Sequence, residues 1–214
     1  MVPSPRVPLP PGADGGAPER LARLAAVLAG SGVGRGLLGP AEADRVWERH
    51  VLPSVLLADL VPDGVLVDVG TGAGLPGLVL AALDPGREVV LVEPRWKAVA
   101  FCLQVVDDLA LASVRVRHRR AERCGVTGDV LTARAVRPPS EVLALLGPLV
   151  RLGGEVVAVV GAGTSPPGAD AAGAGLGRAR LEHVRGHGTE VTVLRAARTS
   201  GTRGTTREEA GAGG

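Results

Sequence analysis

The sequence predicts an α/β protein with a mostly parallel, seven-stranded sheet and an N-terminal helical cap. Three observations lead to this fold class. Short β-branched apolar runs alternate with longer apolar segments from residue 65 onward, as strands and crossover helices do. A glycine-rich turn follows the first run directly, between Gly70 and Gly77. The chain is 45% hydrophobic but has one Phe, two Trp and no Tyr, so small aliphatic side chains must fill its core. Such a core favours helices packed on a sheet.

The first 62 residues precede the predicted sheet. Residues 1–18 are rich in Pro and Gly, and we expect them to form a disordered extension. Residues 19–62 should form the cap, with one helix over 19–29 and one or two helices over 40–60. Pro53 should kink or end a helix there, because proline has no N–H to donate. The apolar side of this segment carries Trp47, Val51, Leu52 and Leu56.

Residues 63–198 should form the α/β domain. Parallel strands are predicted at 65–69, 88–92, 114–117, 130–133 and 154–160, and two closing antiparallel strands at 181–184 and 190–196. The intervening helices are predicted at 75–83, 96–109 and 140–150. Residues 161–177 form a Gly/Ala/Pro run typical of a flexible loop, and 199–214 a polar tail that we expect to be disordered.

The glycine turn predicts a ligand site. A buried strand, a turn with little side-chain bulk and a helix start together make a nucleotide or nucleoside cradle. The spacing of the glycines also matches the dinucleotide fingerprint, so spacing alone leaves an NAD-dependent oxidoreductase or a purely structural turn open. Asp68 precedes the turn, where it would attract a ligand ammonium group but not a pyrophosphate. Glu93 ends the second strand, where a carboxylate can accept from ribose hydroxyls. These two acids favour S-adenosylmethionine as the cofactor.

The stretch Asp68-Val-Gly-Thr-Gly-Ala-Gly-Leu-Pro-Gly77 resembles the signature of the RsmG (glucose-inhibited division protein B) family, bacterial methyltransferases of guanine N7 in 16S rRNA. Trp47-Glu-Arg-His50, Arg120-Ala-Glu122 and Thr132-Ala-Arg-Ala135 fall where that family has similar stretches. The resemblance extends over about residues 21–198. It implies a Rossmann-like, class I S-adenosylmethionine-dependent methyltransferase that acts on 16S rRNA or the small ribosomal subunit. The expected cofactor-binding residues are Asp68, Gly70, Gly72, Leu75, Glu93, Ala121, Glu122 and Arg134.

Two positions depart from the family pattern. The family motif His-x-x-Asp-Ser reads His50-Val-Leu-Pro-Ser54, and Leu-Lys-Gly after strand five reads Val159-Val160-Gly161. A degenerate relative that binds rRNA without methylating it therefore stays an alternative. We interpret His50 as a structural or substrate-side residue, because guanine N7 loses no proton on methylation. No catalytic residue is assigned.

The net charge of +2 is too small to indicate nucleic-acid binding, but Arg115-Val-Arg-His-Arg-Arg120 is a local basic run. It is either a solvated strand end or a phosphate-binding edge; a methyltransferase of small molecules or proteins would not need it. Trp47 and Trp96 are the rings available for base stacking, although Trp96 fits a packing role equally well.

The two cysteines, Cys102 and Cys124, have neither metal-ligand nor redox spacing, which is typical of buried thiols in a reducing cytosol. We expect no metal site. The N-terminus lacks a signal-peptide core, and no apolar run approaches the ~20 residues that span a bilayer. A cytoplasmic, monomeric protein without membrane contact is predicted.

Overall fold

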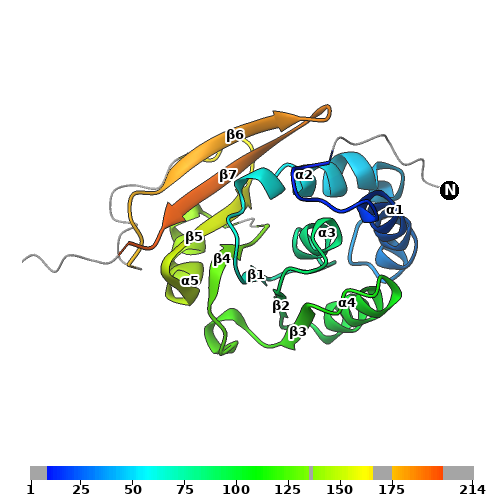
Figure 1. Cartoon of the computed structure of the whole chain (residues 1–214), viewed down its shortest axis with the longest axis horizontal. Helices are drawn as coiled ribbons and strands as arrows, with labels where there is room; N and C mark the ends of the chain where they lie inside the picture. Colours follow the sequence, from blue (N-terminus) through cyan, green and yellow to red (C-terminus); the bar gives the residue numbers. More distant parts are fainter. Residues whose placement is uncertain (1–8, 135–136, 166–174, 200–214) are drawn as a thin grey trace, which may run out of the picture.

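The computed structural model describes residues 9–134, 137–165 and 175–199. A seven-stranded sheet forms its centre, with the strand order β3-β2-β1-β4-β5-β7-β6 (Figure 1). Strands β1 to β5 are parallel, and β7 runs antiparallel to both β5 and β6. The strands are β1 Leu66–Val69, β2 Val89–Glu93, β3 Val114–His118, β4 Gly128–Thr132, β5 Val150–Val160, β6 Arg180–Gly186 and β7 Thr189–Ala197. The predicted mostly parallel, seven-stranded sheet is confirmed.

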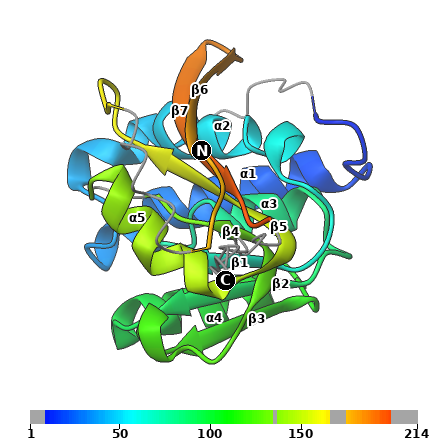
Figure 2. The ribbon, with the colours of Figure 1, turned by 90° about the vertical axis from the view of Figure 1, so that its left-hand side faces the viewer.

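Helices cover both faces of the sheet (Figures 1 and 2). On one face, α3 (Gly77–Leu83) and α4 (Trp96–Asp108) pack with the cap helix α1 (Ala17–Val27) in one hydrophobic cluster. On the other face, α5 (Pro139–Leu146) packs in a second cluster. Every residue of α3 is buried, because α1 and the rest of the cap cover the side of α3 that faces away from the sheet. This explains why the sequence of α3 is apolar on all sides.

The cap consists of short turns rather than one or two regular helices over 40–60. It comprises a 3-10 turn Pro40–Arg45, a π turn Trp47–Val51, the α-helix α2 Leu52–Val55 and a 3-10 turn Ala58–Leu60. Pro53 cannot donate to the Arg49 carbonyl four residues earlier, and the backbone widens into the π turn at this point. The expected apolar side of this segment is buried, including Trp47 and Leu56.

The N-terminal boundary differs from the expectation. Helix α1 begins at Ala17 rather than Glu19, and it continues through a π turn, Leu28–Gly32. Leu9 and Ala13 pack against the core, so residues 9–18 are more ordered than the expected extension. Residues 1–8 lie outside the described residues.

The region after β4 also differs in its boundaries. The helix expected over 140–150 ends at Leu146, a 3-10 turn Gly147–Leu149 follows, and β5 begins at Val150. Pro148 lies within this turn and offers no N–H to continue the helix. Leu176, expected in a flexible loop, is buried in the core beside α5. Residues 166–174 of that loop and 200–214 of the tail lie outside the described residues.

The β6–β7 hairpin connects the sheet to the cap (Figure 1). Thr189, at the start of β7, donates from its hydroxyl to the Glu48 carbonyl at 3.5 Å. A Cβ added at Gly186 would lie 2.7 Å from the side chain of Leu56, the residue that follows α2. The hairpin end is therefore in direct contact with the cap. The cap is therefore held from two sides, by α3 and by the hairpin.

Candidate functional site

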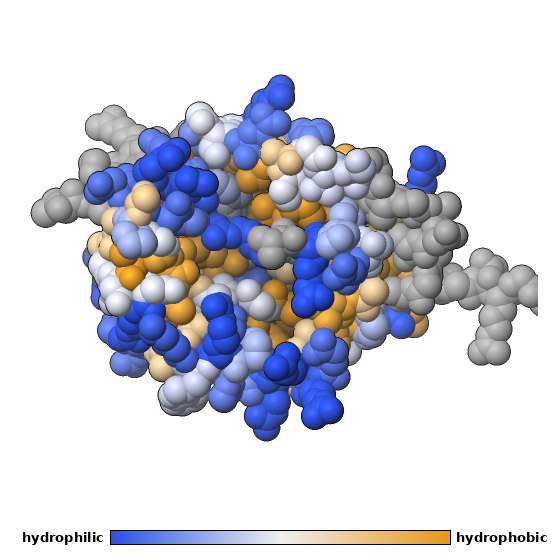
Figure 3. Space-filling model, turned by 180° about the vertical axis from the view of Figure 1, so that it is seen from behind, coloured by the Kyte–Doolittle hydropathy of each residue, from blue (hydrophilic) through white to orange (hydrophobic). Residues whose placement is uncertain are grey.

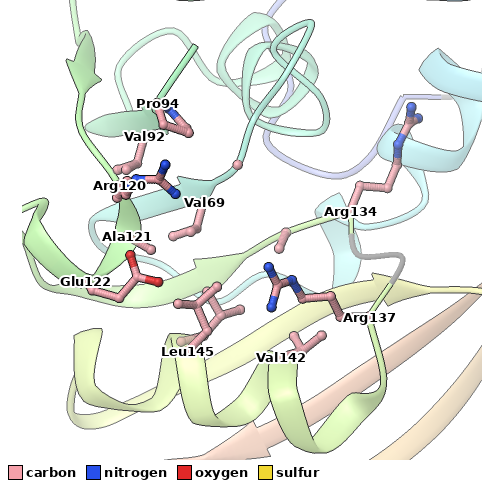
Figure 4. A pocket seen from close by; sticks show the side chains of 13 residues that line it. Val69, Val92, Pro94, Arg120, Ala121, Glu122, Arg134, Arg137, Val142 and Leu145 are labelled. Atoms are coloured by element: carbon pink, nitrogen blue, oxygen red, sulfur yellow. The ribbon is translucent and has the colours of Figure 1, made fainter.

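A pocket of about 260 Å³ opens at the carboxyl ends of β1, β2 and β4 (Figure 4). This edge is where open α/β sheets bind their ligands. Aliphatic residues from the strands and from α5 form its walls, and polar side chains border it. Seen from behind, the molecule is hollowed near its middle, with hydrophilic side chains around hydrophobic ones (Figure 3). The lining residues are Val69, Gly70, Val92, Pro94, Arg120, Ala121, Glu122, Ala133, Arg134, Arg137, Val142, Leu145 and Leu146.

The glycine turn forms the inner border of this pocket. Gly70, Gly72 and Gly74 have φ angles of +70°, +58° and +85°, in the left-handed region that favours glycine. Gly77 is required for a different reason. A Cβ there would lie 2.4 Å from Leu91 and 2.8 Å from the Asp68 carboxylate, so its absence lets α3 approach the sheet closely.

Asp68 is completely buried below the turn, on the face of the sheet that α3 covers. Its Oδ2 accepts from the Thr71 hydroxyl and from the Gly77 N–H, the latter at 2.9 Å. Its Oδ1 has no hydrogen-bond partner among the described residues. Burial raises the pKa of Asp68 to about 6, against the opposing effect of those two hydrogen bonds. A buried, half-satisfied carboxylate of this kind is suited to a cationic group that the protein itself does not supply.

Glu93 joins the end of β2 to the glycine turn. Its Oε2 accepts from the Gly72 N–H, and its Oε1 accepts from the Arg95 N–H and Nε, each at 2.9 Å. Burial by itself would raise the pKa of Glu93, but the hydrogen bonds from Arg95 and Gly72 more than offset it and leave the pKa below its ordinary value. Glu93 is thus an ionised carboxylate that sets the position of the turn.

Arg134 directs its guanidinium toward the cap and away from Ala121 and Glu122 (Figure 4). Its Nη1 lies 2.8 Å from Nδ1 of the buried His50. Burial, and then the nearby Arg134 charge, lower the pKa of His50 to about 4 against the attraction of Glu42. With Nδ1 accepting from Arg134, the neutral ring carries its proton on Nε2, which lies 2.8 Å from Glu42 Oε2. His50 is therefore a structural contact between the cap and the end of β4.

Arg134 lies beyond the end of strand four. Strand β4 ends at Thr132, and Arg134 follows in an isolated bridge to Val159 of β5. The arginine is exposed, and its direct partner is a neutral imidazole. Val160, where the family has a lysine, is buried against the α5 side of the sheet and acts in packing.

Four of the eight expected cofactor-binding residues line the pocket: Gly70, Ala121, Glu122 and Arg134. The others, Asp68, Gly72, Leu75 and Glu93, lie in or under the glycine turn next to it, and their contact with a cofactor stays a prediction. Sequence reasoning missed the walls formed by α5 and by Pro94. Pro94 directly follows Glu93 and could have been inferred from its position, whereas the α5 residues carry no local signal.

Cys102 lies beneath the same turn, with Sγ 3.6 Å from the Gly72 carbonyl oxygen. Burial, and then the charges of Asp68 and Glu93, raise the pKa of its thiol to about 12, so it remains protonated. Both cysteines are buried and unpaired, as predicted. Within residues 9–134, 137–165 and 175–199, no group of His, Cys, Asp and Glu is arranged to hold a metal ion. No helix in the described part of the chain is long and apolar enough to cross a membrane.

The basic run lies on the edge strand β3 and its exit, which we call the basic edge: Arg115, Arg117, Arg119 and Arg120. All four are exposed. Arg117 pairs in register with Val92, so its side chain is on the same face of the sheet as this pocket residue. Arg120 itself lines the pocket. None of the four forms an ion pair with another described residue.

The strand order, the glycine turn after β1 and the acid at the end of β2 define a class I methyltransferase fold. Two solved structures share it at low identity. TYW2 of M. jannaschii in complex with AdoMet is 14% identical with a TM-score of 0.55, and covers 69% of this chain and 74% of its own. Magnesium protoporphyrin IX methyltransferase of Synechocystis PCC 6803 with bound SAM is 15% identical with a TM-score of 0.52. The match covers 84% of this chain and 97% of that structure's chain.

Residues 18–165 match the family described as rRNA small subunit methyltransferase G, and the chain belongs to this family. Relatives named ribosomal RNA small subunit methyltransferase G include that of Acidothermus cellulolyticus, 46% identical over 63% of this chain and 61% of the relative. The relative of Salinispora arenicola is 47% identical over 68% of this chain and 64% of its own length. The relative of Clavibacter sepedonicus is 42% identical over 81% of this chain and 86% of its own length. The chain thus spans less than two thirds of the length of the first two relatives. The resemblance drawn from the sequence is confirmed.

Proposed function

We propose that this chain transfers a methyl group from S-adenosylmethionine to N7 of a guanosine in 16S rRNA, as a cytoplasmic monomer. The observation that carries the proposal is the half-satisfied Asp68 carboxylate beneath a glycine turn that borders the pocket, in a chain of this family. Membership of a methyltransferase family favours methyl transfer over the hydride transfer of an NAD-dependent oxidoreductase.

The residues present fit S-adenosylmethionine. Asp68 Oδ1, buried and without a partner among the described residues, suits the ammonium group of its amino-acid portion. Aliphatic walls such as Val69 and Leu145 suit an apolar ring, and the Ala121–Glu122 backbone and carboxylate can bracket the polar edge of adenine. Glu93, already ionised, retains acceptor capacity for ribose hydroxyls beside its bonds to Gly72 and Arg95. When bound, the cofactor supplies an electrophilic methyl group on a cationic sulfonium.

The protein has no proton to remove in this reaction. Guanine N7 carries its lone pair in the ring plane, so the chain must supply alignment rather than a base. His50 is poorly suited to act as a base, since its Nδ1 lone pair accepts from Arg134 and its pKa is held near 4. The charges at the site accordingly serve binding and positioning.

The basic edge is suited to hold the phosphates of the RNA. Exposed guanidinium groups that form no ion pair with another described residue can each replace a phosphate counterion, and Arg120 brings this charge to the pocket itself. We expect replacement of Arg117, Arg119 and Arg120 by Ala to weaken RNA binding. The slope of the logarithm of the binding constant against the logarithm of salt concentration should become shallower by roughly one for each lost phosphate contact. Arg180 and Arg185, exposed on the strand β6 at the opposite edge of the sheet, are the matched control. An unchanged salt slope would leave the basic edge as a solvated strand end.

Two experiments test the proposed activity. Calorimetry should show saturable binding of S-adenosylmethionine and of its demethylated product, but of neither NAD nor NADP. Radiolabelled methyl transfer to RNA from a strain lacking this gene, mapped by nuclease digestion, should place the label on one guanosine of 16S rRNA. Binding of both cofactor and RNA without transfer would instead support the degenerate relative, and NAD binding without response to S-adenosylmethionine would refute the methyltransferase assignment.

A further inference from the structure

Trp96 is exposed in a way that packing does not explain. It is the first residue of α4, and its side chain is 62% exposed. It is the only aromatic residue among the exposed large hydrophobic side chains of the described residues, the others being Leu103 and Leu152. The sequence made packing at least as good an explanation as base stacking for this ring, and an exposure of 62% argues against a place in the core.

The ring is nevertheless held in place. The Trp96 and His118 rings lie 5.5 Å apart between centroids, inclined at 50°. His118 ends β3, and its Nε2 lies 3.0 Å from the carbonyl oxygen of Pro94. Pro94 lines the pocket. A short chain of contacts therefore connects the exposed indole to the pocket wall.

Positive charge lies on the strand that carries the His118 contact. His118 stands between Arg117 and Arg119 in the sequence, all of them exposed, and alternation along β3 puts the Arg117 side chain on the other face of this edge strand. An exposed indole next to an edge strand whose arginines have no ion-pair partner among the described residues matches the chemistry of single-stranded nucleic acid, whose unpaired bases stack while its phosphates bind cations. A duplex offers phosphates but no free base face, and an acidic peptide offers charge without regular stacking groups. The charge and the ring together favour a single-stranded RNA segment.

We propose that Trp96, braced by His118, stacks on an unpaired base of the substrate RNA next to the segment whose phosphates bind the basic edge. The proposal rests on the proposed function for its RNA partner and goes beyond it by assigning a base-binding position outside the cofactor pocket. That position sets which RNA conformation the protein accepts, because a base can reach the ring only where the strand is unpaired.

The test uses the full chain, an unstructured oligoribonucleotide of about ten nucleotides, and inorganic polyphosphate of similar charge. Trp96→Ala should weaken oligonucleotide binding by roughly tenfold and leave polyphosphate binding unchanged, while Trp96→Phe retains most of the affinity. Leu103→Ala, an exposed position on the same helix, is the control and should bind as the wild type does. The oligonucleotide, but not polyphosphate, should quench the part of the tryptophan fluorescence that Trp96→Phe removes; the other tryptophan, Trp47, is only 6% exposed.

Unchanged oligonucleotide affinity in Trp96→Ala, with no quenching in the wild type, would overturn the stacking role. If the wild type still methylates rRNA in that case, only this inference fails. Absence of any RNA binding by the wild type would overturn the proposed function and this inference together. Circular dichroism of each variant checks that it is folded, which the exposure of both mutated side chains favours.

Discussion

Two buried titratable groups should give the stability of this protein opposite responses to acid. His50 has its pKa lowered from 6.5 to about 4, and Asp68 has its pKa raised from 3.8 to about 6, both chiefly by burial. The perturbations are His50→Gln and Asp68→Asn, which remove one titration each and keep a side chain of similar shape. The double variant removes both.

The sign of each contribution follows from linkage. His50 binds its proton less tightly in the folded state, so its contribution is complete above pH 6.5 and is lost as the pH falls toward 4. Between about pH 7 and about pH 4.5 this loss lowers the free energy of unfolding by ~2 kcal/mol. Asp68 binds its proton more tightly in the folded state, so its contribution is complete below pH 3.8 and is lost as the pH rises through 6. The same acidification therefore stabilises the fold by ~2 kcal/mol through Asp68.

Urea unfolding at these two pH values measures the difference. The two contributions nearly cancel in the wild type. On acidification, the free energy of unfolding of His50→Gln should rise by about 2 kcal/mol, and that of Asp68→Asn should fall by about 2 kcal/mol. The other carboxylates are common to all the proteins and cancel when the profiles are subtracted. The double variant should again resemble the wild type. If both single variants follow the wild-type profile, burial does not shift these two pKa values and the reasoning is wrong.

Three further predictions concern the turn and the chemistry. Glu93→Ala should weaken S-adenosylmethionine binding by about 1–3 kcal/mol in calorimetry. Gly72→Val should weaken it more, because the φ of +58° at Gly72 strains any residue with a side chain. Wild-type affinity in Gly72→Val would exclude the turn as the cofactor site. Gly77→Ala should lower the free energy of unfolding by about 1–3 kcal/mol through its clash with Leu91, whereas Gly86→Ala, whose added Cβ has its nearest neighbour at 3.6 Å, should have little effect. The single-turnover rate with bound RNA should be nearly independent of pH between roughly 6 and 9, and a bell-shaped profile that His50→Ala flattens would contradict a mechanism without a base.

The sequence by itself determined the architecture and singled out the glycine turn that borders the pocket. Strand and helix periodicity, and the glycine spacing between Gly70 and Gly77, are properties of neighbouring residues, so they could be read without a structure. The strands were located within a few residues for this reason, and the family was identified from a continuous stretch. The predicted boundaries differ from the observed ones near Pro53 and Pro148, where a missing N–H changes the turn type locally.

Only the tertiary structure decided how the site is assembled. The partners of Arg134 and Glu93 are His50 and Gly72, which lie 84 and 21 positions away along the chain. No pattern of neighbouring residues specifies such pairs, since they depend on how the cap and strand ends pack. The same holds for the α5 wall of the pocket and for the exposure of Trp96. The groups that the folded chain places around a side chain set its pKa. They also decide whether an aromatic ring faces solvent or the core.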